Sequence, residues 1–458
     1  MIFNHIDMKR LFLFLGDVLI LYASLYLTLF LRYGTGFREQ ISIHLIPFSL
    51  LFILWLLVLY VAGLYELNLS KNSPDFYSSL LTAIAVSSAI SVLFFYLIPD
   101  VQIAPRRNLL IYIVVFTGLV SLWRWLYNRT LGKTFRNNTI IVGFNQLSYD
   151  LAKFLNRNPQ YGYNLKYALG ISEEAAFSFQ STDFRKVRGA KDIERIIESE
   201  HINTIILSPE SYRLPDIIDV FYKASKRNIQ FVNLATAYEE ILKKVPLEAV
   251  NQLWFLENIS RGKKRLYEFL KRVFDIVLAL IGLAALLVLS PVIALAIKFG
   301  SSGPVFYRQK RVGKGGKLFE VIKFRTMVHN AEQNGAVWAQ KNDPRVTRFG
   351  RFLRKTRLDE LPQVITVLKG EISIVGPRAE RPEFVEKLKK QIPFYEERLL
   401  IRPGLTGWAQ VNYGKDLDSN DTKEKLQYDL YYIKNRSFTI DMAVVLKTVK
   451  TVLSATGW

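Results

Sequence analysis

The pattern of hydrophobic positions divides the chain into an apolar first third, a mixed middle and a polar last part with one further apolar run. Four almost uninterrupted apolar runs fill the first third, at residues 11–31, 45–61, 80–98 and 109–126. Each is close to the roughly 20 residues that a helix needs to cross a membrane. A soluble bundle would carry charges at helical spacing, and these runs have almost none. They predict four spanning helices within residues 1–136.

Basic residues beside these runs indicate which ends face the cytoplasm. Lys9 and Arg10 precede the first run, and Arg124 and Arg129 stand at the end of the fourth. Because basic residues favour the cytoplasmic side, both ends of the bundle are expected there, as an even number of spans requires. The first run is too long for a signal-peptide core and lacks a cleavage site, so we expect it to be retained.

A fifth apolar run, residues 273–297, has basic residues on both flanks. Lys271 and Arg272 precede it, Lys298 follows it, and Ser290-Pro291 lies inside it. Proline removes a backbone donor and clashes with the preceding turn, so a helix can break there. One interpretation is a helix over about residues 267–298 that enters one leaflet and returns. The other is a kinked spanning helix, which would move the last domain to the outside.

Residues 137–250 read as a small α/β module, followed by a linker at 251–264. Strand-like runs at 139–142, 203–207 and 229–232 alternate with helical stretches near 147–154, 192–200 and 214–225. This alternation predicts parallel strands joined by crossover helices. Gly143 follows the first strand, but the second and third glycines of a dinucleotide-binding fingerprint are missing. We therefore expect a structural or regulatory module rather than a nucleotide site.

Composition and charge narrow the chemistry. Of the 458 residues 50% are hydrophobic, the net charge is +21, and residues 265–458 carry 33 basic and 19 acidic side chains. The last part is therefore expected to bind an acidic partner, such as nucleic acid, anionic lipid or a phosphorylated small molecule. The chain has no cysteine, which excludes disulfides, thiolate zinc sites and cysteine nucleophiles.

Two adjacent carboxylates, Asp359 and Glu360, follow a cluster of cations that includes Arg354 and Arg357. Neighbouring cations hold a carboxylate ionised, ready to act as a nucleophile or a metal ligand. Adjacent helical residues point in different directions, so the two carboxylates are expected to have different roles. A charged helix start explained by dipole complementarity is the alternative.

Five motifs follow one another in the last part of the chain: VFYRQ (305–309), KFRTM (323–327), LDELPQ (358–363), SIVGPR (373–378) and RPGLTG (402–407). In this order they closely resemble the bacterial sugar transferase family, the monotopic phosphoglycosyl transferases, over about residues 265–458. With the four spans and the α/β module, the chain resembles the long branch of polyprenyl-phosphate hexose-1-phosphate transferases. One departure is Ala379, where the family commonly has proline.

The resemblance implies three parts. These are an integral membrane α-helical bundle of four spans, a Rossmann-like α/β cytoplasmic module with a degenerate nucleotide fold, and an α-rich monotopic catalytic domain at residues 265–458. The re-entrant membrane helix of that domain would break at Ser290 and Pro291. A multi-pass protein of the bacterial inner membrane, with its catalytic domain on the cytoplasmic side, is expected.

The resemblance also implies a reaction. Such enzymes move a sugar-1-phosphate from a UDP-sugar to undecaprenyl phosphate, release UMP, and start an exopolysaccharide, capsule or O-antigen. The family's catalytic pair matches Asp359 and Glu360, with the aspartate as covalent nucleophile and Mg²⁺ as cofactor. Its substrate- and phosphate-binding cations match Lys323, Arg325, Arg354, Arg378 and Arg402. A late aspartate matches Asp441 as a further metal ligand, with Asp429 left open.

Two other functions compete with the transferase. A membrane-anchored nucleotide-sugar dehydratase or epimerase would need a complete glycine fingerprint and a Tyr-x-x-x-Lys pair, and neither is found. A lipid-binding assembly scaffold would use the basic domain for anionic headgroups and would tolerate the loss of Asp359. Nucleic acid is not expected as a partner, because the basic residues lie in loops beside membrane segments. The hexose, and whether the chain forms a homo-oligomer, stay open.

Overall fold

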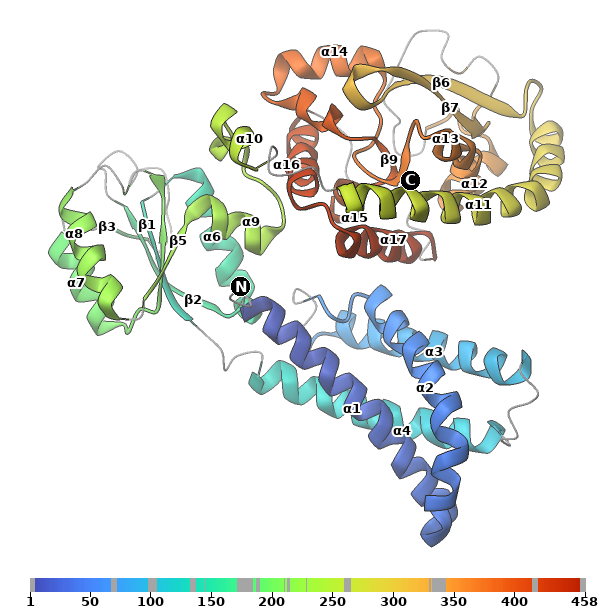
Figure 1. Cartoon of the computed structure of the whole chain (residues 1–458), viewed down its shortest axis with the longest axis horizontal. Coiled ribbons are helices and arrows are strands. Elements are labelled where there is room, and N and C mark those ends of the chain that lie inside the picture. Colours follow the sequence, from blue (N-terminus) through green and yellow to red (C-terminus); the bar gives the residue numbers. More distant parts are fainter. Residues whose placement is uncertain are drawn as a thin grey trace. The chain divides into compact units, whose positions relative to one another are not determined.

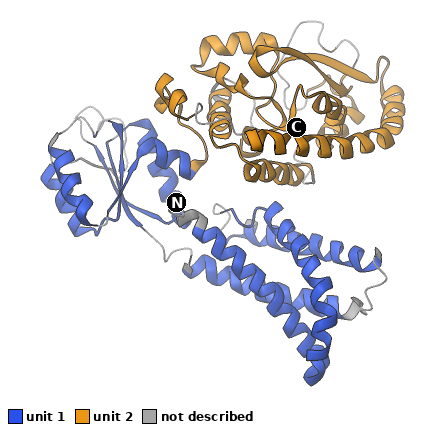
Figure 2. Ribbon diagram, in the orientation of Figure 1, with its two compact units in different colours: residues 1–241 blue, residues 242–458 orange. Residues whose placement is uncertain are grey.

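A computed structural model describes residues 5–66, 72–97, 105–131, 137–143, 145–170, 184–186, 190–209, 211, 215–227, 229–258, 265–328, 331, 343–413 and 419–453. The chain forms two compact units, Met1–Ile241 and Leu242–Trp458, which Figure 2 shows in different colours. The first contains an apolar helical bundle and an α/β module. The second contains the five motifs.

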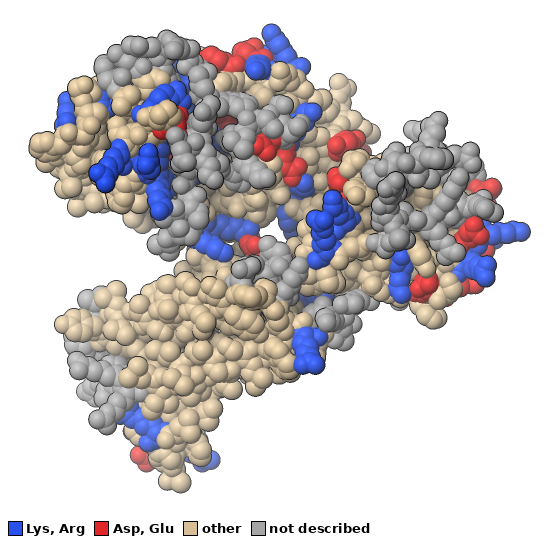
Figure 3. Space-filling model, turned by 180° about the vertical axis from the view of Figure 1, so that it is seen from behind, with Lys and Arg blue, Asp and Glu red and all other residues tan. Residues whose placement is uncertain are grey.

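The four apolar runs form the helices α1 (His5–Tyr33), α2 (Phe37–Val61), α3 (Pro74–Leu97) and α4 (Pro105–Leu126). In the part of the chain that is described, four helical stretches are long and apolar enough to cross a membrane: Met8–Val61, which contains α1 and α2, Phe76–Tyr96, Asn108–Thr130 and Arg265–Gly300. Figure 3 shows a broad face of the bundle with very few charged side chains. The predicted helices of the first third are confirmed, and this composition indicates association with a membrane.

One ion pair is buried inside this bundle. Asp17 on α1 accepts a hydrogen bond from the guanidinium of Arg124 on α4, and neither side chain is exposed by more than 1%. Arg124 also donates to the carbonyl of Leu64, 2.8 Å away, and lies over the ring of Tyr65. Buried charges are tolerated when they are paired in this way, so the pair joins α1, α4 and the turn after α2.

The α/β module is built on a five-stranded parallel sheet with the order β3-β2-β1-β4-β5 (Figure 1). Its strands are β1 (Asn137–Val142), β2 (Tyr163–Gly170), β3 (Phe184–Lys186), β4 (Thr204–Leu207) and β5 (Gln230–Asn233). Its helices are α6 (Gln146–Arg157), α7 (Ala190–Ser199), α8 (Pro215–Ala224) and α9 (Leu234–Leu242). The predicted parallel strands and crossover helices are confirmed, while β2, β3 and α9 were not predicted.

The turn after β1 is closed by the module's own side chains. Gly143 has φ +90°, and a Cβ atom there would come within 1.9 Å of the Ser208 hydroxyl. The hydroxyl of Ser211 donates to the carbonyl of Val142 at 2.6 Å. The Ser148 amide in the first turn of α6 is capped by the Asn145 side chain, which accepts from it at 2.9 Å. This is where a doubly wound fold would bind pyrophosphate, and here one of the amides at the helix end already has a side-chain partner.

The second unit begins earlier than residue 265, the boundary expected from the sequence. Val245 and Val250 are buried in one cluster with Leu426 and Leu430 of the last part of the chain. The Val245 amide donates to the Gln427 carbonyl at 3.0 Å. The segment predicted as a linker contains helix α10 (Gln252–Asn258), and residues 259–264 lie outside the described part. Apolar packing therefore joins residues 242–250 to the second unit rather than to the α/β module.

The second unit combines helices with two small sheets. β6 (Phe306–Val312) and β7 (Leu318–Phe324) form an antiparallel hairpin, and β8 (Ser373–Val375) pairs in parallel with β9 (Gly404–Thr406). Its other helices are α11 (Arg265–Gly300), α12 (Arg348–Thr356), α13 (Val364–Lys369), α14 (Pro382–Gln391), α15 (Trp408–Asn412), α16 (Ser419–Asn435) and α17 (Phe438–Leu453).

Helix α11 has one face in the core and one face outside. Ala279, Leu286 and Ile293 are buried at seven-residue intervals in a core cluster, which they share with side chains of β7, α12 and α13. The opposite face exposes large apolar side chains, among them Val288 and Val292. The hydrogen-bonded helix continues through Pro291, and in Figure 1 its yellow C-terminal part turns away from the line of the first part. A bend in an apolar helix that contains a proline is consistent with both topologies considered above.

Candidate active site

Asp359 and Glu360 lie on η10 (Leu358–Gln363), a short 3-10 helix that follows α12 and packs against β7. Arg357, just before it, has φ +59°, a left-handed conformation that non-glycine residues rarely adopt. Such a residue costs about 1–3 kcal/mol and persists only where the surroundings hold it. The turn at Arg357 brings both carboxylates inward, where Asp359 is 7% and Glu360 8% exposed.

Glu360 is held as an anion by cations from elsewhere in the chain. Lys323 on β7 donates from Nζ to Glu360 Oε1 at 2.6 Å, and Arg378 lies 3.9 Å from the same oxygen. Burial by itself raises the pKa of Glu360, but Lys323, Arg378 and Arg357 together outweigh it and lower this pKa to about 2. The expectation that cations keep one carboxylate ionised therefore applies to Glu360.

Asp359 differs from its neighbour. Its Oδ1 atom is buried, with no hydrogen-bond partner among the residues that the structure describes. Burial, followed by the Glu360 charge, raises the pKa of Asp359 to about 6, although Lys323 and Arg354 oppose this rise. A buried carboxylate oxygen without a partner is costly, and such an atom is typical of a site where a ligand completes the environment. The two carboxylates thus have different environments, as expected.

Arg354 is held in place by a residue that follows β7. Its Nε donates to the hydroxyl of Thr326 at 2.9 Å, just after β7. Gly350 allows this close packing of α12, because a Cβ atom there would lie 2.0 Å from the Thr326 carbonyl oxygen. Burial lowers the pKa of Arg354, and the charges of Asp359 and Asp343 oppose that change. The guanidinium therefore stays cationic, and its charge interacts with that of Asp359.

Arg378 stands on a loop that two glycines hold in place. It follows β8, and a Cβ atom on Gly376 would lie 2.5 Å from the Arg402 carbonyl oxygen. A Cβ atom on Gly404 would lie 2.1 Å from the Gly376 amide nitrogen. Only glycine lets the two backbones approach this closely. The motifs SIVGPR and RPGLTG therefore belong to one structural element.

Two carbonyl groups after Gly376 accept hydrogen bonds from arginines. Arg398 on η11 (Tyr395–Leu400) donates to the carbonyl of Arg378 at 3.1 Å, and Arg311 donates to the carbonyl of Ala379 at 3.0 Å. The contact at position 379 uses the carbonyl of Ala379, a group that alanine and proline share. Arg398 is itself paired with Asp429, 2.8 Å away. Asp429 thus acts on the site through Arg398 and the loop that carries Arg378.

The double variant Arg398→Met with Asp429→Leu separates the effect of this ion pair on protein stability from its effect on the position of the Arg378 loop. Arg398→Met alone is expected to destabilise the protein by about 3–5 kcal/mol, because Asp429 is left as an uncompensated buried charge. Adding Asp429→Leu removes that charge and is expected to restore most of the stability. Transfer activity is expected to stay low, because the Arg378 carbonyl has lost its donor. Chemical denaturation and UMP release measure the two effects, and a double variant with normal turnover would contradict the positioning role.

Three predicted site residues lie elsewhere. Arg325 donates to the carbonyl oxygens of Ser301 and Ser302 at 2.8 and 2.6 Å, so it fastens the segment between α11 and β6 to the end of β7. Arg402 is exposed and lines a separate cavity. The oxygens of Asp441 accept hydrogen bonds from Tyr267, Lys271 and Tyr432 at 2.6–2.9 Å. The structure thus brings together Lys323, Arg354, Asp359, Glu360 and Arg378.

Asp359 and Glu360 are the carboxylates that fit a magnesium ion. Among the described residues no group of three or more His, Cys, Asp or Glu side chains is placed to hold a metal. Mg²⁺ is commonly bound by one or two carboxylates, with waters and substrate phosphates as its other ligands. The free Oδ1 atom of Asp359 suits such a ligand set. Asp441 does not, because its oxygens are already engaged in hydrogen bonds.

The sequence analysis did not predict three features of the site. These are the turn at Arg357, the hydrogen bond from Arg354 to Thr326, and the support that Arg398 gives to the Arg378 loop. Thr326 lies inside the KFRTM motif, so its place there was a signal. Nothing in the sequence predicts the positive φ of Arg357, because arginine seldom adopts this conformation. Arg398 stands among Glu396, Glu397 and two leucines, a pattern that is typical of an exposed charged residue.

A family model and several known proteins match this chain. The family model described as bacterial sugar transferase matches residues 266–455. A UDP-N-acetylgalactosamine-undecaprenyl-phosphate N-acetylgalactosaminephosphotransferase of Aeromonas hydrophila is 40% identical over 262 residues, 53% of this chain and 62% of that protein. An undecaprenyl-phosphate galactose phosphotransferase of Salmonella typhimurium is 41% identical over 211 residues, 42% of each chain.

A third relative is matched over most of its length. The UDP-glucose:undecaprenyl-phosphate glucose-1-phosphate transferase of Xanthomonas campestris pv. campestris is 31% identical over 352 residues, which cover 73% of this chain and 72% of that protein. The three relatives carry the names of three different sugars, so similarity alone does not select one. The match to the family model falls on the unit that contains the Asp359–Glu360 pair. This chain belongs to the bacterial sugar transferase family.

Proposed function

We propose that the protein transfers a sugar-1-phosphate from a UDP-sugar to undecaprenyl phosphate and releases UMP. The observation that carries the proposal is the pair on η10, where an ionised Glu360 paired with Lys323 lies beside a buried Asp359 with a free oxygen. The named relatives act on undecaprenyl phosphate with a sugar phosphate, and the chain spans 62% and 72% of the first two.

In the proposed mechanism Asp359 is the nucleophile. Its carboxylate attacks the phosphorus that bears the sugar, the bond from this phosphorus to the bridging oxygen breaks, and UMP leaves with the bonding electrons. The phosphate oxygen of the lipid acceptor then attacks the same phosphorus and frees the carboxylate. A covalent intermediate divides the transfer into two steps, which suits a donor in water and an acceptor in a membrane.

The remaining groups stabilise charge. Arg354 and Arg378 interact with the charges of the pair, so they can bind the diphosphate and the charge that develops during transfer. Lys323 keeps Glu360 ionised, so Glu360 is available as a ligand or as a hydrogen-bond acceptor. Mg²⁺ held by Asp359 and Glu360 would neutralise charge on the diphosphate when bound.

The proposed function also requires a particular course of α11 in the membrane. If α11 enters one leaflet and returns at Ser290 and Pro291, the catalytic unit stays on the cytoplasmic side, where UDP-sugars occur. The exposed apolar face of α11 supports its contact with lipid. The α/β module would then be a Rossmann-like domain without a nucleotide, because Ser208 and Ser211 close the turn after β1. The product would start an exopolysaccharide, capsule or O-antigen.

A donor panel tests this function. Protein in detergent micelles with Mg²⁺ is incubated with UDP-glucose, UDP-galactose and their N-acetylated forms, with and without undecaprenyl phosphate. UMP release that depends on the acceptor is expected from one donor, and Glu360→Gln is expected to lower it by at least about 100-fold, as for loss of a group acting in the transition state. A folded protein that binds the lipid but releases no UMP from any donor would favour the assembly scaffold.

A further inference from the structure

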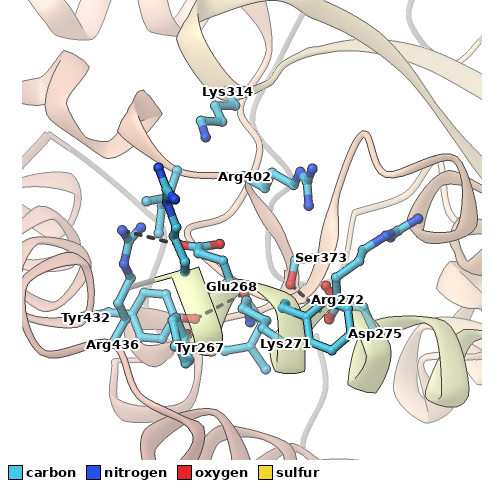
Figure 4. A pocket seen from close by; sticks show the side chains of 14 residues that line it. Tyr267, Glu268, Lys271, Arg272, Asp275, Lys314, Ser373, Arg402, Tyr432 and Arg436 are labelled. Atoms are coloured by element: carbon cyan, nitrogen blue, oxygen red, sulfur yellow. Dashed lines mark hydrogen bonds and ion pairs between the residues drawn. The ribbon is translucent and has the colours of Figure 1, made fainter. Parts of the chain in front are cut away.

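The second unit contains a cavity of about 550 Å³ beside the start of α11 (Figure 4). Its walls come from the first turns of α11, from β8 and the segment 401–402, from the end of α16, and from the turn of the β6–β7 hairpin. The figure shows the Lys314 and Arg402 side chains on the side opposite Tyr267 and Tyr432. The nucleophile Asp359, its neighbour Glu360 and Lys323 do not line this cavity.

The lining is strongly cationic. Six basic side chains face two acidic ones, Glu268 and Asp275, the basic ones being Arg265, Lys271, Arg272, Lys314, Arg402 and Arg436. Three of the six have partners within the protein. Lys271 pairs with Asp441 at 2.9 Å, Arg436 with Glu268 at 3.3 Å, and Arg272 donates to the carbonyls of Val367 and Leu368 at 2.7 Å.

The other three cations lack such partners. The side chains of Arg265, Lys314 and Arg402 make no hydrogen bond or ion pair with any residue that the structure describes. They come from three separate segments, the start of α11, the hairpin turn and the RPGLTG motif. Asp275 makes no ion pair with them; its Oδ1 accepts from the Ser373 hydroxyl and the Ile374 amide, both at 3.0 Å. A compact anion with several oxygens, such as a phosphate monoester, is a ligand that three unpartnered cations lining one cavity can bind.

The rim of the cavity is apolar on the side of α11. Phe269 lines the cavity and is 64% exposed, and Leu266, three residues before it, is 71% exposed. Leu270 and Val273 continue this exposed apolar surface along the helix. α11 is also one of the stretches apolar enough to enter a membrane. A ligand with a phosphate at one end and a hydrocarbon chain at the other would satisfy both the cations and this surface.

We propose that this cavity binds the phosphate monoester of a membrane lipid, with the lipid chain along the exposed face of α11. This proposal rests on the proposed function, because its acceptor, undecaprenyl phosphate, is the phosphate monoester of a membrane lipid. Ser373 and Val375 of β8 line the cavity, and Arg378 follows three residues after Val375. The lipid phosphate would therefore be held beside the strand that leads into the Arg378 loop, and would have to move from there to Asp359 for transfer.

Direct binding of radiolabelled undecaprenyl phosphate tests this site. The full chain is used in detergent micelles in the Asp359→Asn background, so that no turnover interferes. Lys314→Gln is expected to weaken the affinity by about tenfold or more, because one of three donors to a dianion is lost. Lys317→Gln is the matched control, since Lys317 is exposed near the same hairpin turn and does not line the cavity.

Two further arms identify the ligand chemistry. Phosphatidic acid is expected to compete with undecaprenyl phosphate, and inorganic phosphate is expected to compete at least about 100-fold more weakly, since it gains nothing from the apolar surface. Equal affinity of Lys314→Gln and Lys317→Gln would overturn the site, and inorganic phosphate that competes as well as the lipid would overturn the lipid claim. The assay measures binding alone, so its result is independent of whether any donor yields UMP.

Discussion

Replacing Asp359 by asparagine is expected to abolish sugar-phosphate transfer, with a loss of at least about 1,000-fold in turnover. The amide has nearly the same shape as the carboxylate but cannot attack phosphorus. Asp359 is buried and its Oδ1 has no partner among the described residues, so the substitution breaks no hydrogen bond of that atom. The folded state is therefore expected to survive, and UMP release from the preferred donor measures the effect.

A matched carboxylate provides the control for this variant. Glu320 lies exposed on β7, where it pairs with Arg308 on the neighbouring strand. Glu320→Gln is expected to keep turnover within about twofold, because exposed ion pairs contribute little. Substantial acceptor-dependent transfer by Asp359→Asn would rule out Asp359 as the covalent nucleophile.

Replacing Lys323 by methionine is expected to damage both stability and activity. Lys323 is the partner of Glu360 at 2.6 Å, and Arg378 is further away at 3.9 Å. Loss of one member of a buried pair typically costs about 3–5 kcal/mol, because the other charge is left uncompensated. Glu360 is then expected to take up a proton, which removes the anion beside Asp359. Chemical denaturation of the purified protein and UMP release measure the two effects.

Two variants give the comparison for Lys323. Lys323→Arg keeps the positive charge and is expected to recover most of the stability, but less of the activity, because a guanidinium does not fit the ammonium's place. Lys310→Met, exposed on the neighbouring strand β6, is expected to change neither quantity by more than experimental error. A Lys323→Met protein as stable as the wild type would show that Glu360 does not depend on this pair.

The parts of the fold with strong local patterns could be predicted from the sequence. The apolar runs of the first third gave α1–α4, because uninterrupted hydrophobicity over that length leaves few other structures. Strand β2, by contrast, reads YNLKYALG and mixes polar with apolar residues. It forms a strand because it pairs with β1 on one side and β3 on the other, and such pairing depends on residues far away in the sequence.

The active-site residues likewise divide into those that local motifs predict and those whose place depends on distant parts of the chain. The motifs identified Lys323, Asp359, Glu360 and Arg378, because each motif carries its chemistry within a few residues. They could not show where a side chain points, so Arg402 was expected at the phosphate although it lines another cavity. The late aspartates could not be separated by spacing either. Their roles depend on distant partners, Lys271 for Asp441 and Arg398 for Asp429.

Mass spectrometry of the protein after incubation with donor alone tests the central claim most directly. The wild-type chain is mixed with the preferred UDP-sugar and Mg²⁺ without undecaprenyl phosphate, quenched in acid and digested. Our account predicts a peptide that carries one added sugar phosphate on Asp359, absent from Asp359→Asn and removed when the lipid acceptor is supplied. Acceptor-dependent transfer with no such adduct, or an adduct on another residue, would contradict the mechanism.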